Sequence, residues 1–599
     1  MKQKERTRLR ARAVALFACF ILVTLGLGSR LWFVQIRGGQ AWTAYAGTQQ
    51  RGKFDVSGRR GSIVDRFGIV FAATVPAVQI FAQPPDVKDA RNEAAVLAPL
   101  LKRPEKSVLA DLTSPEPFVY LARNAPKAVG QTISKLDLPG VGVKDEATGA
   151  HVDPQGHIGS TVIGFTGDDN QGLAGIEHTF NDVLAGKAGR IVADTDSQDR
   201  IIPFGQHMVD EPVVGDTVVL TIDRALQLAA EDVLSKTATK YNAASAVAIV
   251  MRVSTGEILA LANWPDYDPN HWKSFGQDAY RNRAIADPYE PGSTFKIVTA
   301  TAALDSAKVS LDDTFPAVDR LDIGGYVIHN ADDGLVSSGR SREPLADIIA
   351  FSHNVGAAEV ALHIGKTTMG DYIKRFGFDD VTGIDLSGES AGIGVSSDEW
   401  FGSRRATVAF GQGVSVTAIA IARAYAAVAN GGLLMRPLIV RQILSPSGRV
   451  IKQYTPDPVR RVMRPQTAAK LLAMLRDVVK RGTGSNAQIA GYAVAGKTGT
   501  AQIVEAGGYM PGEYVASFVG IVPADKPQYV VLVNVERPRG AYYGGVVAAP
   551  AFRELARRVL WREGVLPKRA DGADDALSPA NDAKRTKRDK AQGNQGGRR

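Results

Sequence analysis

The order of strand-like and helix-like segments predicts an α+β fold for this chain. Residues 246–265 hold two apolar runs joined by a Ser-Thr-Gly-Glu turn, which is typical of a β-hairpin. Helical patterns then dominate from about 293 to 481, and strand-like sequence returns at 489–535 before a last helix at about 548–562. Because strands flank a long helical segment on both sides, we expect a sheet assembled from both ends of one domain.

The segment before this domain has a different character. Residues 38–210 contain short apolar runs broken by Gly, Pro and Asp, with no obvious catalytic set. The pattern of 59–73 predicts a turn and a strand, and that of 159–167 predicts a strand ending in a turn. A further strand at 218–222 leads into a helix that begins near Asp223.

Length and composition bound the function classes. The chain has 599 residues, so two or three domains are expected. Its net charge of +9 lies in two tails, because residues 1–12 contribute +5 and residues 568–599 contribute +4. The neutral middle argues against a nucleic-acid partner, whose footprint is a basic face. Since Cys19 is the one cysteine and no HxxxH pair occurs, we expect no disulfide, metal or cofactor.

An uncharged apolar run, 13–29, follows the basic N-terminal residues. The alternatives to a membrane anchor are a cleaved signal peptide and a buried core helix. Arg30 and Trp32 follow the run where a cleavage site and polar sequence would be expected, and basic residues do not usually precede a core helix. We therefore expect a retained signal-anchor helix at 13–36, with the tail 1–12 in the cytoplasm and the bulk of the chain outside.

The first motif is S-x-x-K, and Ser293 with Lys296 is its one occurrence in the chain. The spacing places both side chains on one face of a helix. A partly desolvated lysine can be neutral and accept the serine proton, and a helix N-terminus favours a developing anion. The alternative is an exposed lysine beside a serine that caps the helix.

The second motif is Ser352-His353-Asn354, between the helix-like stretches PLADIIAF and VGAAEVAL. A hydroxyl and a carboxamide two residues apart on a loop can face one site. The alternative is helix capping, because Ser and Asn both favour helix ends. We assign no role to His353.

The third motif is Lys497-Thr498-Gly499-Thr500, within GYAVAGKTGT. These letters also match the phosphate-loop pattern G-x-x-x-x-G-K-[ST], which requires a helix that begins at the lysine. Threonine and glycine are poor at starting a helix, and the alternating apolar flanks favour a strand. We therefore expect no nucleotide.

In this order, S-x-x-K, S-x-N and K-T-G are the set found in penicillin-recognising serine enzymes. The chain resembles class B penicillin-binding proteins, bitopic peptidoglycan D,D-transpeptidases, over nearly all of its length to about residue 565. RRGSIVDRFG, GLAGIEHTFN and AFGQGVSVT are similar to family landmarks, and YEPGSTFK with YYGGVVAAPAF resembles the division-specific FtsI branch.

The resemblance implies a transpeptidase domain with a central antiparallel sheet flanked by helices. It also implies an elongated, mainly β or mixed pedestal and one transmembrane helix. The expected divisions are a cytoplasmic tail 1–12, an anchor 13–36, a pedestal 37–212, a transpeptidase domain 213–566 and a disordered basic tail 567–599.

The resemblance further implies a role for each motif residue. The implied catalytic roles are nucleophile for Ser293, general base for Lys296, proton relay for Ser352, substrate amide binding for Asn354 and positive potential for Lys497. Thr498, Gly499 and Thr500 would bind the substrate, and the backbone N–H groups of Ser293 and Thr500 would form the oxyanion hole.

The implied substrates are stem peptides ending in D-Ala-D-Ala, with β-lactams as covalent inhibitors. A SEDS-class glycosyltransferase and other division proteins of the bacterial inner membrane are the implied partners, at the division septum. An elongation-specific transpeptidase, a β-lactamase or β-lactam sensor, and a non-catalytic division scaffold remain as alternatives.

Overall fold

Five strands from two distant parts of the chain form the central sheet, and every neighbouring pair is antiparallel. The hairpin predicted at 246–265 is present, and the returning strands complete the sheet as expected. The computed structural model describes residues 2–37, 51–56, 58–195, 201–331, 340–505 and 508–568. In spatial order the strands are β10 (Ile258–Trp264), β9 (Ser245–Arg252), β21 (Tyr529–Glu536), β20 (Gly508–Val522) and β19 (Ala495–Glu505).

Helices cover both faces of this sheet, as β9 illustrates. Ala246, Ala248 and Val250 pack into one core with α9 (Arg224–Lys240) and α19 (Gly544–Arg562). The residues between them face the opposite core, because side chains alternate along a strand. Since both faces are buried, β9 is apolar at nearly every position. The opposite core is formed with α11 (Lys296–Asp305), α13 (Leu345–Phe351), α14 (Asn354–Ile364), α15 (Lys366–Phe376), α17 (Ala418–Ala429) and α18 (Pro465–Arg481).

Short elements connect these helices and strands. They are η3 (Pro269–Ser274), η4 (Gln277–Tyr280), α10 (Arg283–Ala286), η5 (Gly292–Phe295), β11 (Thr314–Pro316), β12 (Arg320–Ile323), β13 (Tyr326–His329), β14 (Arg342–Pro344), η6 (Ser397–Glu399), α16 (Arg404–Thr407), η7 (Val408–Phe410), β15 (Leu433–Met435), β18 (Pro458–Arg461) and η8 (Ser485–Ala487).

The N-terminal half is an arm rich in β-structure, built on a sheet of order β17-β16-β8-β2-β3-β4 with β5 also paired to β3. Three of these strands, β8 (Thr217–Leu220), β16 (Val440–Leu444) and β17 (Val450–Gln453), come from beyond residue 213, so the sheet joins the two halves. The arm also contains β1 (Arg51–Val56), β2 (Ile63–Val64), β3 (Val70–Ala82), η2 (Pro84–Asp86), α3 (Ala90–Leu101), α4 (Glu105–Leu112), β4 (Val119–Pro126), α5 (Lys127–Leu136), β5 (Val141–Val152), α6 (Ser160–Ile163), α7 (Gly175–Thr179), α8 (Asn181–Leu184), β6 (Gly189–Thr195) and β7 (Ile201–Asp210).

The strand predicted at 159–167 is wrong, because the structure has the short helix α6 there. Gly159 and Gly164 bound the helix with φ of +75° and +84°, which glycine adopts without steric cost. All four residues of α6 are buried. Four consecutive apolar or small residues do not distinguish a buried helix from a buried strand, because so short a run has no visible period.

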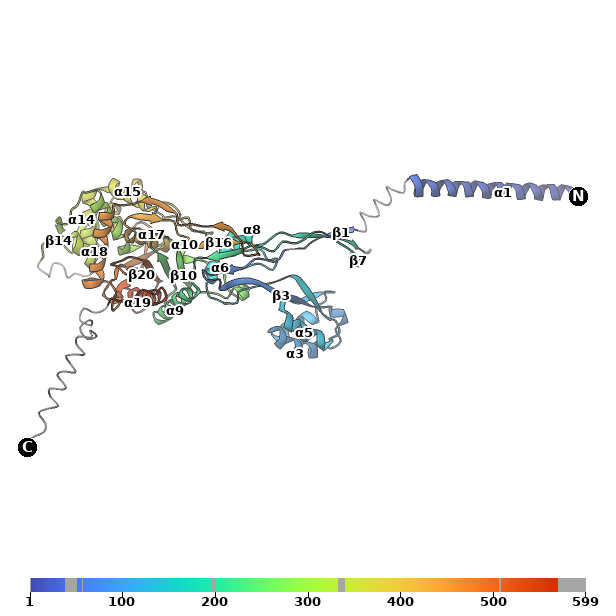
Figure 1. The fold of residues 1–599 in the computed structure, drawn as a ribbon, viewed down its shortest axis with the longest axis horizontal. Coiled ribbons are helices and arrows are strands. Elements are labelled where there is room, and N and C mark those ends of the chain that lie inside the picture. Colours follow the sequence, from blue (N-terminus) through green and yellow to red (C-terminus); the bar gives the residue numbers. More distant parts are fainter. Residues whose placement is uncertain are drawn as a thin grey trace, which may run out of the picture.

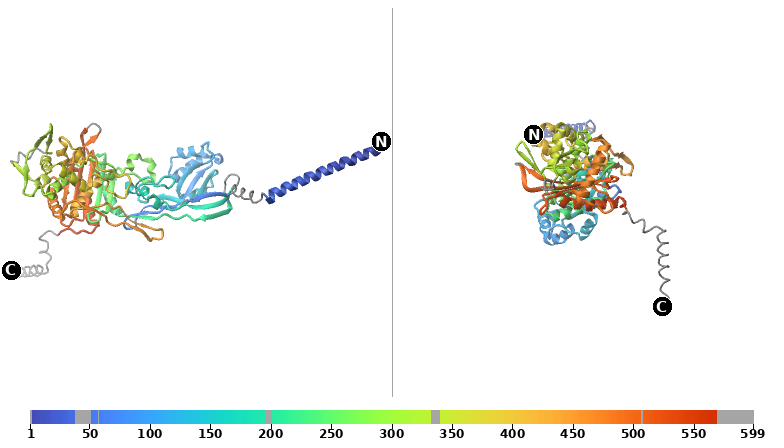
Figure 2. Two further views of the ribbon diagram at one scale, coloured as in Figure 1. Left: turned by 90° about the horizontal axis from the view of Figure 1, so that it is seen from above. Right: turned by 90° about the vertical axis from the view of Figure 1, so that its left-hand side faces the viewer.

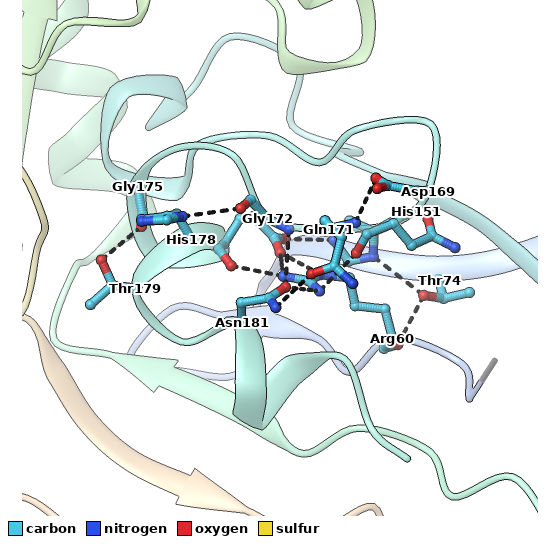
Figure 3. A network of polar contacts seen from close by, with 12 residues as sticks. Arg60, Thr74, His151, Asp169, Gln171, Gly172, Gly175, His178, Thr179 and Asn181 are labelled. Carbon is cyan, nitrogen blue, oxygen red and sulfur yellow. Dashed lines mark hydrogen bonds and ion pairs between the residues drawn. The ribbon is translucent and has the colours of Figure 1, made fainter. Parts of the chain in front are cut away.

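A buried polar network joins the stretches RRGSIVDRFG and GLAGIEHTFN in the arm (Figure 3). Arg60 donates to Glu177 Oε2 at 2.6 Å and to the Glu177 carbonyl at 2.8 Å. His151 Nε2 lies 2.6 Å from Glu177 Oε1, and Arg60 also donates to Asn181 Oδ1 at 2.9 Å. Burial raises the pKa of Glu177, but His151 and Arg60 outweigh it and leave that pKa below its ordinary value.

The N-terminal helix α1 spans Lys2–Trp32 and continues as a π-helical turn, Phe33–Arg37. Helix therefore begins within the predicted basic tail rather than at residue 13. Among the described residues one helix is long and apolar enough to cross a membrane, with a mean hydropathy of 2.1 over its apolar window. Figures 1 and 2 show α1 at one end of a long molecule, the arm in the middle and the sheet with its helices at the other end. The predicted disordered tail 567–599 lies outside the described residues except for Pro567 and Lys568.

Candidate active site

A cavity of about 460 Å³ opens at the edge of the central sheet. It is lined by parts of all three motifs, which lie far apart in the chain: η5, the loop between α13 and α14, and β19. The predicted site residues on its wall are Ser293, Ser352, Asn354, Thr498 and Thr500.

Ser293 lies in η5, a single 3-10 turn directly before α11. The preceding Gly292 has φ of +55°, and its N–H donates to Gly411 O at 3.2 Å. The Glu290 carboxylate accepts a hydrogen bond from Gly413 N at 2.7 Å. The landmark AFGQGVSVT therefore holds the turn that presents the serine.

Gly499 allows this turn to pack against β19. A Cβ atom at Gly499 would lie 2.3 Å from Ser517 Oγ and 3.0 Å from Pro291 O, closer than side chains pack. A larger residue would displace the Ser517 side chain on β20 and would also press on Pro291 and Thr294 at the turn that carries the serine. The glycine of K-T-G thus meets a packing requirement.

Lys296 is fully buried at the start of α11 and is surrounded by the second motif. Its Nζ donates to Ser352 O at 2.5 Å and to Asn354 Oδ1 at 2.9 Å, and it lies 3.2 Å from Ser352 Oγ. Among the hydrogen bonds of the described residues, none joins Lys296 to the Ser293 hydroxyl. Such catalytic contacts often form only once substrate is bound.

The backbone at Ser352 explains how this loop reaches the lysine. Ser352 ends α13 with φ of +65°, a left-handed conformation that costs a residue with a side chain about 1–2 kcal/mol. Asn354 begins α14, and its N–H donates to Asn330 Oδ1 at 2.8 Å. The same oxygen accepts from Val355 N at 3.1 Å, so Asn330 caps α14 and holds the motif in place.

His353 lies buried beside the motif, and its partner is a carboxylate rather than a catalytic group. Its Nδ1 lies 2.5 Å from Glu343 Oε2, and its ring stacks on Phe351 with centroids 5.9 Å apart. The side chain does not line the cavity, whereas Phe351 does. His353 therefore packs against Phe351 on the side away from the cavity and helps to hold that wall residue in place.

The two lysines of the site have depressed pKa values. Burial lowers the pKa of Lys296 well below its ordinary value, the charge of Lys497 lowers it further, and Glu343 opposes these effects. Burial also lowers the pKa of Lys497, to about 7. Neither lysine forms an ion pair with a carboxylate within the described part of the chain. Since a neutral amine accepts a proton, Lys296 is chemically suited to act as a base.

The K-T-G-T end of the cavity favours an anion. Thr498 Oγ1 lies 2.7 Å from Thr483 Oγ1, and Thr500 Oγ1 accepts a hydrogen bond from Gly544 N at 3.0 Å. Gly544 begins α19, so the partial positive charge of that helix N-terminus faces the threonines. As predicted, the K-T-G-T stretch is a strand and not the start of a helix.

Sequence reasoning missed part of the cavity wall. Phe410 and Gln412 lie within AFGQGVSVT and Tyr543 lies within YYGGVVAAPAF, so these stretches were recognised without a role at the site. The signal for Thr483 is a Gly-Thr-Gly turn shortly before the third motif. Helices and loops from elsewhere in the chain bring in the missed residues. These include Phe351, Phe410, Gln412, Thr483, Asn486 and Tyr543.

Two known domain families match the chain. The penicillin binding protein transpeptidase domain matches residues 246–557, and the penicillin-binding protein dimerisation domain matches residues 55–220. The first match contains the central sheet, the cavity and all three motifs. The fold and site therefore define a serine-type penicillin-binding transpeptidase.

Relatives extend this match over most of the chain. Stage V sporulation protein D of Bacillus subtilis (strain 168) is 35% identical over 92% of this chain and 85% of its own length. Peptidoglycan D,D-transpeptidase FtsI of Escherichia coli (strain K12) is 31% identical over 93% of this chain and 92% of its own. The crystal structure of penicillin-binding protein 3 of Mycobacterium tuberculosis complexed with aztreonam has a TM-score of 0.66 and 29% identity, covering 86% of this chain and 98% of that chain. The chain belongs to the class B penicillin-binding proteins, the peptidoglycan D,D-transpeptidases.

The expected fold class, family and enzyme class are thus confirmed. The N-terminal apolar helix, together with the FtsI-like relatives, fits a single-pass membrane protein.

Proposed function

We propose that this chain crosslinks the peptidoglycan of the division septum through an acyl-enzyme on Ser293. The observation that carries the proposal is the convergence of Ser293, Ser352 and Thr500 on one cavity beside two buried lysines. The relatives named FtsI and stage V sporulation protein D support this septal role, as does the likeness of YEPGSTFK and YYGGVVAAPAF to the division-specific FtsI branch.

In the first half-reaction Ser293 Oγ attacks the carbonyl carbon of the penultimate D-alanine while its proton passes to the neutral amine of Lys296. The backbone N–H groups of Ser293 and Thr500 stabilise the oxyanion, an effect that typically contributes about 3–4 kcal/mol per donor. The peptide C–N bond then breaks, and terminal D-alanine leaves after its nitrogen receives the proton through Ser352. The 3.2 Å contact between Ser352 Oγ and Lys296 Nζ supports this path.

In the second half-reaction the amine of another stem peptide attacks the acyl carbon. A new C–N bond forms, the ester bond to Ser293 breaks, and Oγ regains a proton. The amine loses its proton through the same Ser352 and Lys296 groups, so the enzyme returns to its starting state.

The substrate carboxylate binds at Thr498 and Thr500, where Lys497 and the N-terminus of α19 supply positive potential. Asn354 holds the substrate amide. β19 is an edge strand among the described strands, so an extended peptide can add to it through backbone hydrogen bonds. A β-lactam that resembles the D-Ala-D-Ala end would acylate Ser293 in the same geometry.

The domain division and membrane topology also remain proposals. We infer a cytoplasmic tail 1–12, an anchor 13–36, a pedestal 37–212 and a transpeptidase domain 213–566. The apolar run that follows basic residues supports this orientation by the positive-inside rule. A SEDS-class glycosyltransferase and other division proteins would contact the anchor and the pedestal in the bacterial inner membrane.

Labelling with fluorescent penicillin tests the site. We expect the wild type to be labelled and Ser293→Ala to remain unlabelled at equal folded amounts. Labelling that survives Ser293→Ala removes the nucleophile, and an unlabelled wild type favours a scaffold role. Rapid turnover of the bound penicillin favours a β-lactamase.

Localisation of a fluorescent fusion tests the septal role. We expect the signal at midcell during division. Signal spread along the side wall contradicts the septal proposal and favours an elongation enzyme.

A further inference from the structure

Figure 1 shows α6, α9 and β10 close together where the arm meets the transpeptidase half. Three metal-ligating side chains from these segments lie close to one another. His157 lies in the turn before α6, Glu231 lies on α9, and Asp266 follows β10. One ligand atom from each lies within 4.8 Å of the other two. The three residues are too far apart in sequence for a spaced metal motif, so the chain pattern alone does not reveal them.

Glu231 is the central residue of this cluster, and only half of its carboxylate is satisfied. The residue is 7% exposed, and its Oε1 accepts from Gly159 N and Gln227 Nε2, both at 2.8 Å. Its Oε2 is buried without a hydrogen-bond partner, and no Lys or Arg pairs with it among the described residues. A buried carboxylate oxygen without a partner is costly, because protein interiors stabilise charge poorly.

The chemistry of the donors indicates which cation would satisfy this oxygen. Imidazole nitrogen and carboxylate oxygen are both ligands that zinc accepts, and a water would complete a four-coordinate site with these three side chains. Tetrahedral zinc with ligand distances of about 2.0–2.2 Å places its donor atoms about 3.3–3.6 Å apart, so the three ligand atoms, now within 4.8 Å of one another, must close by about 1 Å when the ion binds. His157 is exposed and Asp266 is partly exposed, so both side chains can move toward the buried Glu231, and the exposure of His157 also admits the ion and the water.

We propose that His157, Glu231 and Asp266 bind one divalent zinc ion that ties the arm to the transpeptidase half. The ion adds to direct polar contacts at the same junction. Asn263 Nδ2 donates to Thr161 Oγ1 at 2.9 Å, and Tyr267 OH donates to Ser160 O at 3.0 Å. Zinc therefore fixes the angle between the two halves and takes no part in acyl transfer.

Zinc binding by the full-length chain in detergent tests the site directly. After removal of metal by a chelator, equilibrium dialysis against zinc followed by elemental analysis should give one ion per chain. Glu231→Gln keeps the side-chain volume and an acceptor for Gly159 N but removes the charged ligand. We expect it to weaken zinc binding at least 30-fold, and His157→Gln and Asp266→Asn to do the same.

His271→Gln is the matched control, because His271 is an exposed imidazole 2.9 Å from the carboxylate of Asp268 near the same junction. It should bind zinc as tightly as the wild type. Zinc should raise the Tm of the wild type and of this control, but not the Tm of the three ligand variants.

Penicillin labelling of Ser293 separates this proposal from the acyl-transfer proposal, since it should not depend on zinc. The zinc site is refuted if the wild type takes up no stoichiometric zinc, or if all three variants bind it as tightly. Equal affinity for calcium or magnesium overturns the assignment to zinc.

Discussion

Buried titratable side chains occur in both halves of the molecule, but those around Arg60 in the arm and those beside the cavity differ in whether an opposite charge is paired with them. In the arm, Arg60 donates four hydrogen bonds, two of them to Glu177, and His151 engages the other Glu177 oxygen. Beside the candidate active-site cavity, Lys296 and Lys497 are both fully buried but pair with no carboxylate among the described residues. The contrast indicates that a compensated buried charge maintains structure, whereas an uncompensated one is available for chemistry.

Replacing Lys296, the proposed general base, should give the largest change in activity with little loss of stability. Lys296→Met removes the proposed base, so the rate of penicillin acylation should fall about 10²–10⁴-fold. Its Tm should change little, because the lost hydrogen bonds to Ser352 O and Asn354 Oδ1 are offset by the removal of an amine whose charged form burial disfavours. Stopped-flow acylation and thermal unfolding measure the two effects. A large loss of stability with modest loss of acylation would show that Lys296 is structural.

In the arm we expect a large loss of stability with little change in activity. Glu177→Gln leaves the buried Arg60 charge uncompensated, which should destabilise the arm by about 3–5 kcal/mol. Acylation of the molecules that remain folded should be unchanged. Chemical denaturation, monitored by hydrogen exchange of amides in the arm, measures the loss of stability.

The exposed ion pair of Lys273 and Asp168 is the control for Glu177→Gln. Because both side chains are more than half exposed, Lys273→Met should cost no more than about 1 kcal/mol. Equal losses for the two variants would contradict the distinction between buried and exposed pairs.

The rate of acylation should depend on pH through both lysines, and the two dependences should run in opposite directions. Lys296 acts when neutral, so the rate rises with pH up to its depressed pKa. Lys497 attracts the carboxylate when charged, and its pKa is about 7, so the second-order rate constant should fall roughly tenfold per pH unit well above that value. Lys497→Arg should remove the alkaline limb, because arginine stays charged. An alkaline limb that persists in this variant belongs to another group.

The smallest expected effect concerns the left-handed backbone of Ser352. Ser352→Gly and Ser352→Ala both remove the proposed proton relay, so both should slow acylation similarly. Glycine relieves the backbone cost, so Ser352→Gly should be about 1 kcal/mol more stable than Ser352→Ala. Comparing the two unfolding curves measures the cost of holding the motif in this conformation.

Much of the fold follows from local patterns. The β9–β10 hairpin, the strand at Lys497 and the helices on either side of Ser352 were all predictable from turn chemistry and apolar periodicity. The helix at 160–163 was not, because a run of four buried residues carries no period. The roles of Asn330 and Thr483 could not be predicted either. Asn330 caps the helix that begins at Asn354, and Thr483 contacts Thr498, and neither pair is close in sequence.

The amino-acid order alone established the three motifs, the apolar anchor run and hence the family, because residue types and spacings are properties of the chain. The environment of each side chain depended on tertiary packing. Burial lowers the pKa of two lysines in one half, four hydrogen bonds hold Arg60 in the other, and three metal-ligating side chains from distant segments meet at the junction. Solvation and electrostatic interaction depend on distance in space, which the sequence does not express.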